Sequence, residues 1–163
     1  MSLMTLNVDI PSQKMMVCSD DVVVKEYLIS TGKNGVGELF GSEKTPRGLH
    51  VIRAKIGANC PANTVFVGRR PTGEIFSPEL REKFPDRDWI LTRIFWLSGL
   101  EVSKNRLGNV DTMRRFIYIH GTPDDVLLGT PGSRGCIRMH NNDIIELFNL
   151  VPVGTRILIK NND

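Results

Sequence analysis

Cysteine and histidine are the residue types in this sequence whose spacing could support covalent chemistry. His120 ends an apolar run and is followed by Gly121, and Cys136 comes sixteen residues later, directly after Gly135. A cysteine thiolate is a strong nucleophile, and a neighbouring imidazole can generate it by taking the thiol proton. The amides of Gly135 and Cys136 could point at an oxyanion. Together these groups indicate acyl transfer.

The strand that positions the histidine is predicted over residues 116–120. Side chains alternate along a strand, so Phe116, Tyr118 and His120 share one face, and His120 stands at the end. Gly121 allows a sharp turn, and a backbone carbonyl there could accept the Nδ1 proton. The other ring nitrogen, Nε2, would then be free to act as a base.

Two cations and two competing interpretations bear on the cysteine. Arg134 and Arg138 lie close to Cys136 in the sequence and would favour its thiolate. Taken alone, Cys136 would more often be a small buried apolar residue, and His120 a structural residue. His120, Cys136 and His140 could also bind zinc, but no fourth ligand has suitable spacing, so no metal site is expected.

Length and composition indicate an ordinary globular chain. It has 163 residues, of which 40% are hydrophobic and 24% charged, and we expect one domain over residues 1–163. No window approaches the roughly 18 apolar residues that a membrane-spanning helix needs. The net charge of +3 is small and the basic clusters are short, which excludes a dedicated nucleic-acid-binding protein. Three cysteines without a CxxC pair argue against a disulfide framework and leave at least one thiol free, with Cys18 and Cys60 structural.

Short strands dominate the predicted secondary structure. Alternation and turn residues predict strands over residues 6–10, 14–18, 22–30, 49–56, 64–67, 90–99, 116–120 and 155–160. A glycine-rich loop is expected over residues 31–48, and a turn over residues 71–73. The sequence therefore predicts a mainly β fold of the sandwich or barrel-like kind.

One or two short helices complete the prediction. Ile144, Leu147, Phe148 and Val151 follow helical spacing, with Asp143 and Glu146 as a capping box. A shorter helical turn is expected over residues 77–83, where Ser77 would be the cap and Pro78 the first helical residue.

These residues resemble the L,D-transpeptidase catalytic domain, the YkuD-like family. The family pattern is a histidine, a spacer, then Ser/Thr-His-Gly-Cys followed by an apolar residue and Asn or Arg. Here it reads His120-Gly121-Thr122, a spacer, and Ser133-Arg134-Gly135-Cys136-Ile137-Arg138. The turns at residues 30–32, 45–48 and 153–155 are also similar, so the resemblance covers nearly the whole chain. One departure is Arg134, which stands where the family usually has histidine.

The resemblance implies a mixed-sheet L,D-transpeptidase fold and a bacterial cell-wall enzyme that needs no metal or organic cofactor. Cys136 would attack the carbonyl of the L-centre of a diamino acid in a peptidoglycan tetrapeptide stem and release D-alanine. His120 would take the thiol proton and return it to the leaving amine. The side-chain amine of a neighbouring stem would resolve the thioester and give a 3→3 cross-link.

Other roles follow from the same resemblance. Arg138 and Arg134 would bind a stem carboxylate, because guanidinium forms charge-assisted hydrogen bonds with carboxylates. Ser133 and Gly135 would shape the loop around the oxyanion. Carbapenem-type inhibitors would acylate Cys136.

Three alternatives to a transpeptidase remain, of which two use the same cysteine and histidine and one has no catalytic activity. Water as the acceptor would make the protein an L,D-carboxypeptidase that trims muropeptides. Loss of activity, marked by Arg134, would leave a peptidoglycan-binding module. A general thiol acyltransferase or peptidase would act on ordinary peptides. The first residues carry no secretory signal, so we expect the periplasm or cell envelope if an export signal has been removed, and the cytoplasm if the chain is complete.

Overall fold

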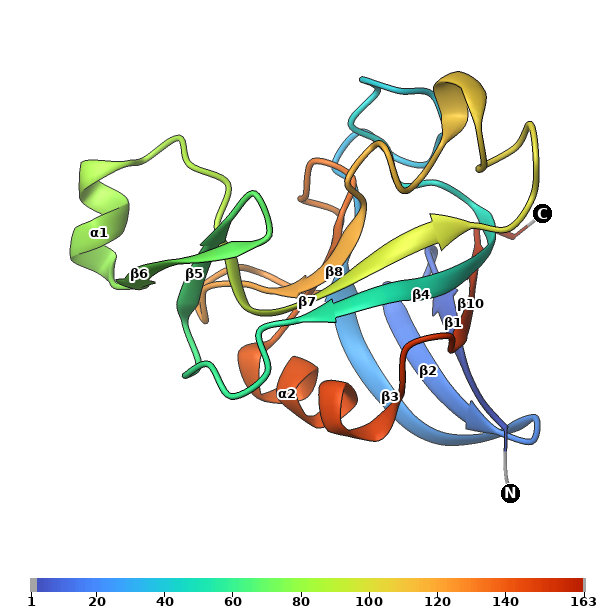
Figure 1. Ribbon diagram of the computed structural model, residues 1–163, viewed down its shortest axis with the longest axis horizontal. Coiled ribbons are helices and arrows are strands. Elements are labelled where there is room, and N and C mark those ends of the chain that lie inside the picture. The colour runs from blue at the N-terminus through green and yellow to red at the C-terminus, as the bar shows by residue number, and fades with distance from the viewer. Residues whose placement is uncertain (1–2, 163) are drawn as a thin grey trace.

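The computed structural model describes residues 3–162. Within that range it contains ten strands of one sheet, two α-helices and a short 3-10 helix at Gly108–Val110 (Figure 1). The helices are α1 (Pro78–Lys83) and α2 (Asn141–Leu150). The strands are β1 (Met4–Asp9), β2 (Lys14–Ser19), β3 (Val22–Ser30), β4 (Gly48–Ile56), β5 (Thr64–Val67), β6 (Arg70–Ile75), β7 (Ile90–Gly99), β8 (Tyr118–Gly121), β9 (Ile137–Met139) and β10 (Arg156–Lys160). The predicted mainly β class is confirmed, and no helix of the described chain is long and apolar enough to cross a membrane.

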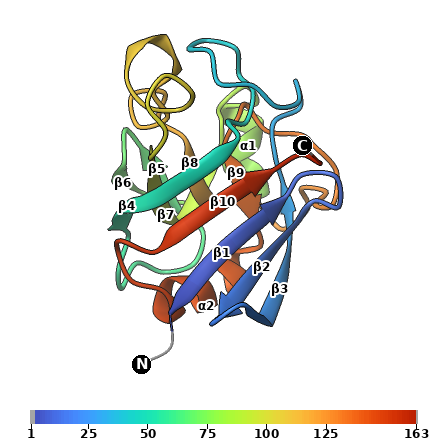
Figure 2. The same cartoon turned by 90° about the vertical axis from the view of Figure 1, so that its right-hand side faces the viewer.

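The sheet closes on itself like a barrel. Its order is β4-β10-β1-β2-β3-β9-β8-β7, and β4 pairs again with β7. Figure 2 shows β4, β10, β1, β2 and β3 side by side along one wall. The β1–β10 and β8–β9 pairs are parallel and the others are antiparallel. The hairpin β5–β6 pairs with the start of β7 and extends away from the barrel together with α1 (Figure 1).

The core lies inside this closed sheet. Leu6 and Val8 of β1 are almost wholly buried, as strand alternation requires, and Ile144, Leu147 and Phe148 of α2 enter the same cluster. Helix α2 contacts both β7 and β8. The helix therefore packs behind the strand that carries His120.

The strand predicted over residues 116–120 begins later than expected. Strand β8 starts at Tyr118, whereas Phe116 has a positive φ of 57° and is 52% exposed. The cause is a turn in which Phe116 N donates to Met113 O at 3.1 Å and Ile117 N to Thr112 O at 3.4 Å. The prediction that Phe116 shares the strand face of His120 is wrong.

The predicted capping box of α2 is also wrong. The helix begins at Asn141 with His140 as its N-cap, so Asp143 lies within the first turn. Glu146 instead accepts a hydrogen bond from the Tyr27 hydroxyl at 2.6 Å. The side chain of Asn141 accepts a hydrogen bond from Thr92 Oγ1 on β7, and this tertiary contact holds the earlier start.

Two expectations for the extending hairpin had different outcomes. The turn expected at residues 71–73 is wrong, because Gly68 and Arg69 make the reversal with positive φ values of 58° and 64°. Pro71 lies within β6, the last strand of the sheet, where a missing N–H is tolerated. The cap predicted for α1 is confirmed, since Ser77 Oγ accepts from Leu80 N at 3.1 Å.

Candidate active site

His120 is the buried base candidate. It lies on β8 with 1% of its surface exposed, and its Nδ1 is 2.7 Å from the carbonyl oxygen of Gly121. A carbonyl can only accept, so Nδ1 carries the proton and Nε2 keeps its lone pair. Gly121 has no space for a side chain, because a Cβ there would lie 2.4 Å from Asn141 Oδ1 and 2.6 Å from Leu91 O. This tight packing fixes the carbonyl that orients the ring.

Cys136 is placed beside the chain that carries His120 by a short strand that the sequence did not predict. Strand β9 follows the cysteine directly and pairs in parallel with β8, with His120 opposite Arg138. Sγ of the half-buried Cys136 accepts a hydrogen bond from Tyr118 N at 3.3 Å and donates one to Phe116 O at 3.5 Å. The thiol thus lies along the chain that leads into His120.

Burial dominates the electrostatics of both groups. Desolvation raises the pKa of the Cys136 thiol to about 12, although the Tyr118 N–H, Arg138 and Arg115 act to lower it. Desolvation also lowers the pKa of His120, against the carboxylate of Asp88 and the Gly121 carbonyl, which raise it. At neutral pH the thiol of Cys136 and the imidazole of His120 are therefore both uncharged.

The cations that act on the thiol differ from those expected. Arg138 is one of them, as anticipated, but the second is Arg115 rather than Arg134. Arg115 donates to Lys44 O at 2.6 Å and to Gly37 O at 3.2 Å, so it also ties the glycine-rich loop to the site. Only the neighbouring arginine pair at residues 114–115 hinted at it in the sequence.

The loop before the cysteine is held by its own hydrogen bonds. Gly135 has a φ of +118°, its N–H donates to Ser133 Oγ at 3.1 Å, and its carbonyl accepts from Thr45 Oγ1 at 2.9 Å. Ser133 Oγ also donates to the carbonyl of Cys136. The expectation that the Gly135 amide points at an oxyanion is wrong, because Ser133 already occupies that donor.

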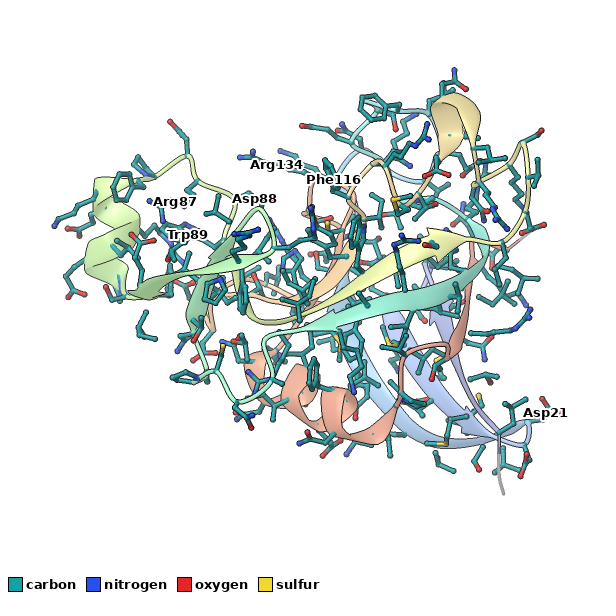
Figure 3. The ribbon with its side chains drawn as sticks, in the orientation of Figure 1. Asp21, Arg87, Asp88, Trp89, Phe116 and Arg134 are labelled. Carbon is teal, nitrogen blue, oxygen red and sulfur yellow. The ribbon has the colours of Figure 1, made fainter. Side chains whose placement is uncertain are left out.

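The two arginines of the motif point to different neighbours. Arg134 donates from Nη2 to the carbonyl of Asp86 at 3.0 Å, and it borders a hollow of about 190 Å³ together with Phe116. Arg138 donates to Gly132 O at 3.0 Å and lies 3.7 Å from Asp88 Oδ1. Figure 3 shows Arg134 and Asp88 on facing sides of this region, one from the cysteine loop and one from the segment that follows α1.

Other sequence candidates lie away from this arrangement or have structural places. His140 caps α2, Cys18 is buried, and Cys60 is a partly buried member of an apolar cluster. Within residues 3–162 no group of three or more His, Cys, Asp or Glu side chains could hold a metal ion. Asp88 is, after Arg115, a second charged residue that the sequence interpretation missed. Its one signal was its place immediately before the buried Trp89.

Comparison with known proteins gives a consistent assignment. The family model of the L,D-transpeptidase catalytic domain matches residues 4–159. The Bacillus subtilis protein YkuD, which carries an L,D-transpeptidase name, is 39% identical over 89 residues, 55% of this chain and 44% of that protein. The match therefore spans less than half of that relative.

Solved structures share the fold at low sequence identity. An L,D-transpeptidase from Mycobacterium smegmatis superposes with a TM-score of 0.57 at 19% identity, covering 98% of this chain and 59% of that one. L,D-transpeptidase 3 from Mycobacterium tuberculosis, in complex with a faropenem-derived adduct, gives a TM-score of 0.60 at 16% identity, with coverage of 98% and 61%.

Proposed function

This chain belongs to the family of L,D-transpeptidase catalytic domains, and we propose that it transfers the acyl group of a peptidoglycan stem peptide through Cys136. One observation carries the proposal. Cys136 directly precedes β9, the strand that pairs with the strand of His120, and the same two side chains, Asp88 and Arg138, act on the thiol and on the imidazole. A cysteine thiol and an imidazole with a free lone pair on neighbouring stretches of chain are the residue types of a nucleophile and its base.

The proposed first step forms a thioester. As the scissile carbonyl approaches, the Cys136 thiol proton moves to Nε2 of His120 and Sγ bonds to the carbonyl carbon of the L-centre of the diamino acid. The tetrahedral oxyanion then collapses, the bond to the D-alanine nitrogen breaks, and the His120 proton passes to that leaving amine. The products are free D-alanine and an acyl-enzyme.

The second step transfers the acyl group to an amine. The side-chain amine of a neighbouring stem attacks the thioester carbon, its proton goes to His120, and the Cys136 sulfur leaves and is reprotonated. A 3→3 cross-link results. Water in place of the amine would yield a tripeptide and make the same site a carboxypeptidase.

Backbone and loop groups support these steps. Of the two amides expected at the oxyanion, that of Cys136 is the one we assign, because the Gly135 N–H donates to Ser133. Arg138 is the candidate for a stem carboxylate, since its Nε is buried without a partner among the described residues. Arg134 would bind the stem carboxylate only after its hydrogen bond to the carbonyl of Asp86 breaks.

The proposal extends to inhibitors, domain organisation and place of action. β-Lactams of the carbapenem type should acylate Cys136, because the ring carbonyl offers the thiolate the same electrophile as the stem. Residues 1–163 would act as one catalytic domain. The substrate class would place the activity at the bacterial cell envelope.

Mass spectrometry tests the proposal directly. Purified protein would be incubated with a disaccharide tetrapeptide, with Cys136→Ala as the control. We expect loss of D-alanine and the appearance of a cross-linked dimer with the native protein, and neither product with the variant.

The other outcomes are decisive as well. Tripeptide without dimer would identify a carboxypeptidase. Unchanged tetrapeptide with both proteins, together with binding that Cys136→Ala leaves intact, would identify a binding module and overturn the proposal. Turnover that survives Cys136→Ala would exclude the cysteine mechanism.

A further inference from the structure

Asp88 lies on a segment that reaches the active site from outside the barrel. The segment joins α1 to β7, and Trp89 anchors it by packing into an apolar cluster with Val65 and Leu91. Trp89 also meets Phe76 edge to face, with ring centroids 5.1 Å apart. Its neighbour Asp88 is thereby held toward the cysteine loop, as Figure 3 shows.

The carboxylate of Asp88 meets the catalytic strands through Arg138. Asp88 Oδ1 lies 3.7 Å from Arg138 Nη2, and the two side chains are only 27% and 18% exposed. Arg138 is the register partner of His120 in the parallel β8–β9 pair, so their side chains lie side by side on one face of the sheet. Carboxylate, guanidinium and imidazole therefore form one cluster.

The reaction places a positive charge in this cluster. The imidazole of His120 is almost wholly buried, and burial disfavours the imidazolium that forms when it accepts the thiol proton. Among the charged groups that act on His120, Arg138 opposes that charge and Asp88 favours it. The thiolate that forms at the same time is favoured by Arg138 and Arg115 and disfavoured by Asp88.

We propose that Asp88 is a positioning residue that holds Arg138 in place and stabilises the positive charge of His120 during proton transfer. This inference rests on the proposed function and deepens it. The segment after α1 then belongs to the active site, because His120 reaches its full rate as a base only while Asp88 contacts Arg138. Arg134 makes one exposed contact with the same segment, at the carbonyl of Asp86, and Trp89 is the residue that anchors the segment.

The test compares Asp88→Asn with Asp86→Asn. Both substitutions remove one negative charge from the same segment, but the side chain of Asp86 is exposed, and only its backbone carbonyl contacts Arg134. The rate of acylation by a carbapenem would be followed by intact-protein mass spectrometry between about pH 5 and 9, where a histidine base titrates. We expect Asp88→Asn to lower the plateau rate about tenfold, the factor equivalent to one pKa unit.

The pH profile separates a positioning role from a structural one. Because Asp88 raises the pKa of His120, Asp88→Asn should also move the acid limb of the profile to lower pH. Asp86→Asn should retain the plateau and the limb of the native protein. A lower plateau with an unmoved limb, or equal effects of the two variants, would overturn the inference.

A second readout does not depend on activity. The imidazole of His120 can be titrated by NMR in the native protein and in both variants, with His120→Gln to assign its signals. The inference requires a lower pKa for His120 in Asp88→Asn and an unchanged one in Asp86→Asn. Absence of acylation in the native protein would contradict the proposed function, whereas an unshifted titration in Asp88→Asn would contradict the role of Asp88.

Discussion

Two buried histidines of this molecule are held alike at one ring nitrogen and differently at the other. His50 on β4 has Nδ1 3.0 Å from Gly48 O, and His120 on β8 has Nδ1 2.7 Å from Gly121 O. Both rings therefore carry the proton on Nδ1 and present a lone pair at Nε2. In His50 that lone pair accepts a hydrogen bond from Thr112 Oγ1 at 2.9 Å. In His120 no hydrogen bond within residues 3–162 engages it.

The difference indicates which of the two buried histidines is available to act as a base. Around His50 both nitrogens are satisfied and desolvation lowers its pKa to about 4, so the ring stays neutral and structural. Around His120 the free lone pair shares its surroundings with a thiol and with Asp88, which favours the protonated ring. Burial alone does not distinguish the two. What distinguishes them is Nε2, which accepts a hydrogen bond from Thr112 in His50 and is left without a hydrogen bond from the described residues in His120.

The strongest way to break the comparison is to remove the base. We expect His120→Gln to lower the rate of Cys136 acylation by about 10²- to 10⁴-fold, the usual contribution of a general base. Stopped-flow measurement of β-lactam consumption would give the rate. Thermal unfolding should show a folded protein, and a rate within a few-fold of the native one would show that His120 is not the base.

A pH titration of stability tests the neutral state of His50. Its folded pKa of about 4 lies below the ordinary value of 6.5, so the unfolded chain binds more protons between these values. Stability is then fully present above about pH 6.5 and falls as the pH drops toward 4, by about 3 kcal/mol at most for this one group.

Urea unfolding at several pH values would measure this slope. His120 is also shifted downward and contributes in the same direction, so His50→Gln and His120→Gln need to be compared. We expect His50→Gln to flatten part of the slope. An identical slope in His50→Gln and the native protein would contradict a neutral, buried His50.

Local residues pointed to His120 and Cys136 as a candidate pair, but tertiary contacts decided the surroundings of both. The sequence pointed to His120, Gly121, Gly135 and Cys136 because the histidine and the cysteine each stand next to a glycine, and such a pattern can be recognised within a few residues. Strand β9 has only three residues and exists through its pairing with β3 and β8, so no local pattern predicts it. The same holds for Phe116, which a hydrogen-bonded turn removes from the strand.

The roles of single donors and charges were also beyond the sequence. Whether the Gly135 amide faces substrate depends on the Ser133 hydroxyl, which takes it. Whether Arg134 or Arg115 acts on the thiol depends on where the chain folds back, and Arg115 arrives from before β8. Asp88 comes from a segment outside the barrel. Such groups are chosen by three-dimensional packing and not by spacing.

A smaller effect sharpens the comparison from the structural side. Thr112→Val removes the hydroxyl that satisfies Nε2 of His50 and keeps nearly the same shape. We expect a loss of about 1–3 kcal/mol in the free energy of unfolding, the cost of a buried polar group without a partner. Urea denaturation would measure it. Acylation of Cys136 should be unchanged, and a large loss of rate at native-like stability would link the His50 region to catalysis.

The smallest effect is expected at Arg134. Arg134→His restores the residue that the family usually carries and removes the exposed hydrogen bond to Asp86 O, which contributes about 0.5–1.5 kcal/mol. Arg134 is not one of the groups that act on the thiol or on His120, so the acylation rate should change by less than about threefold, which is below 1 kcal/mol of barrier. The same acylation assay and a thermal melt would measure both quantities. A rate change as large as that of His120→Gln would show that acylation depends on the loop that carries Arg134 as much as on His120. The hydrogen bonding of Nε2 in the two histidines would then no longer explain which of them acts as the base.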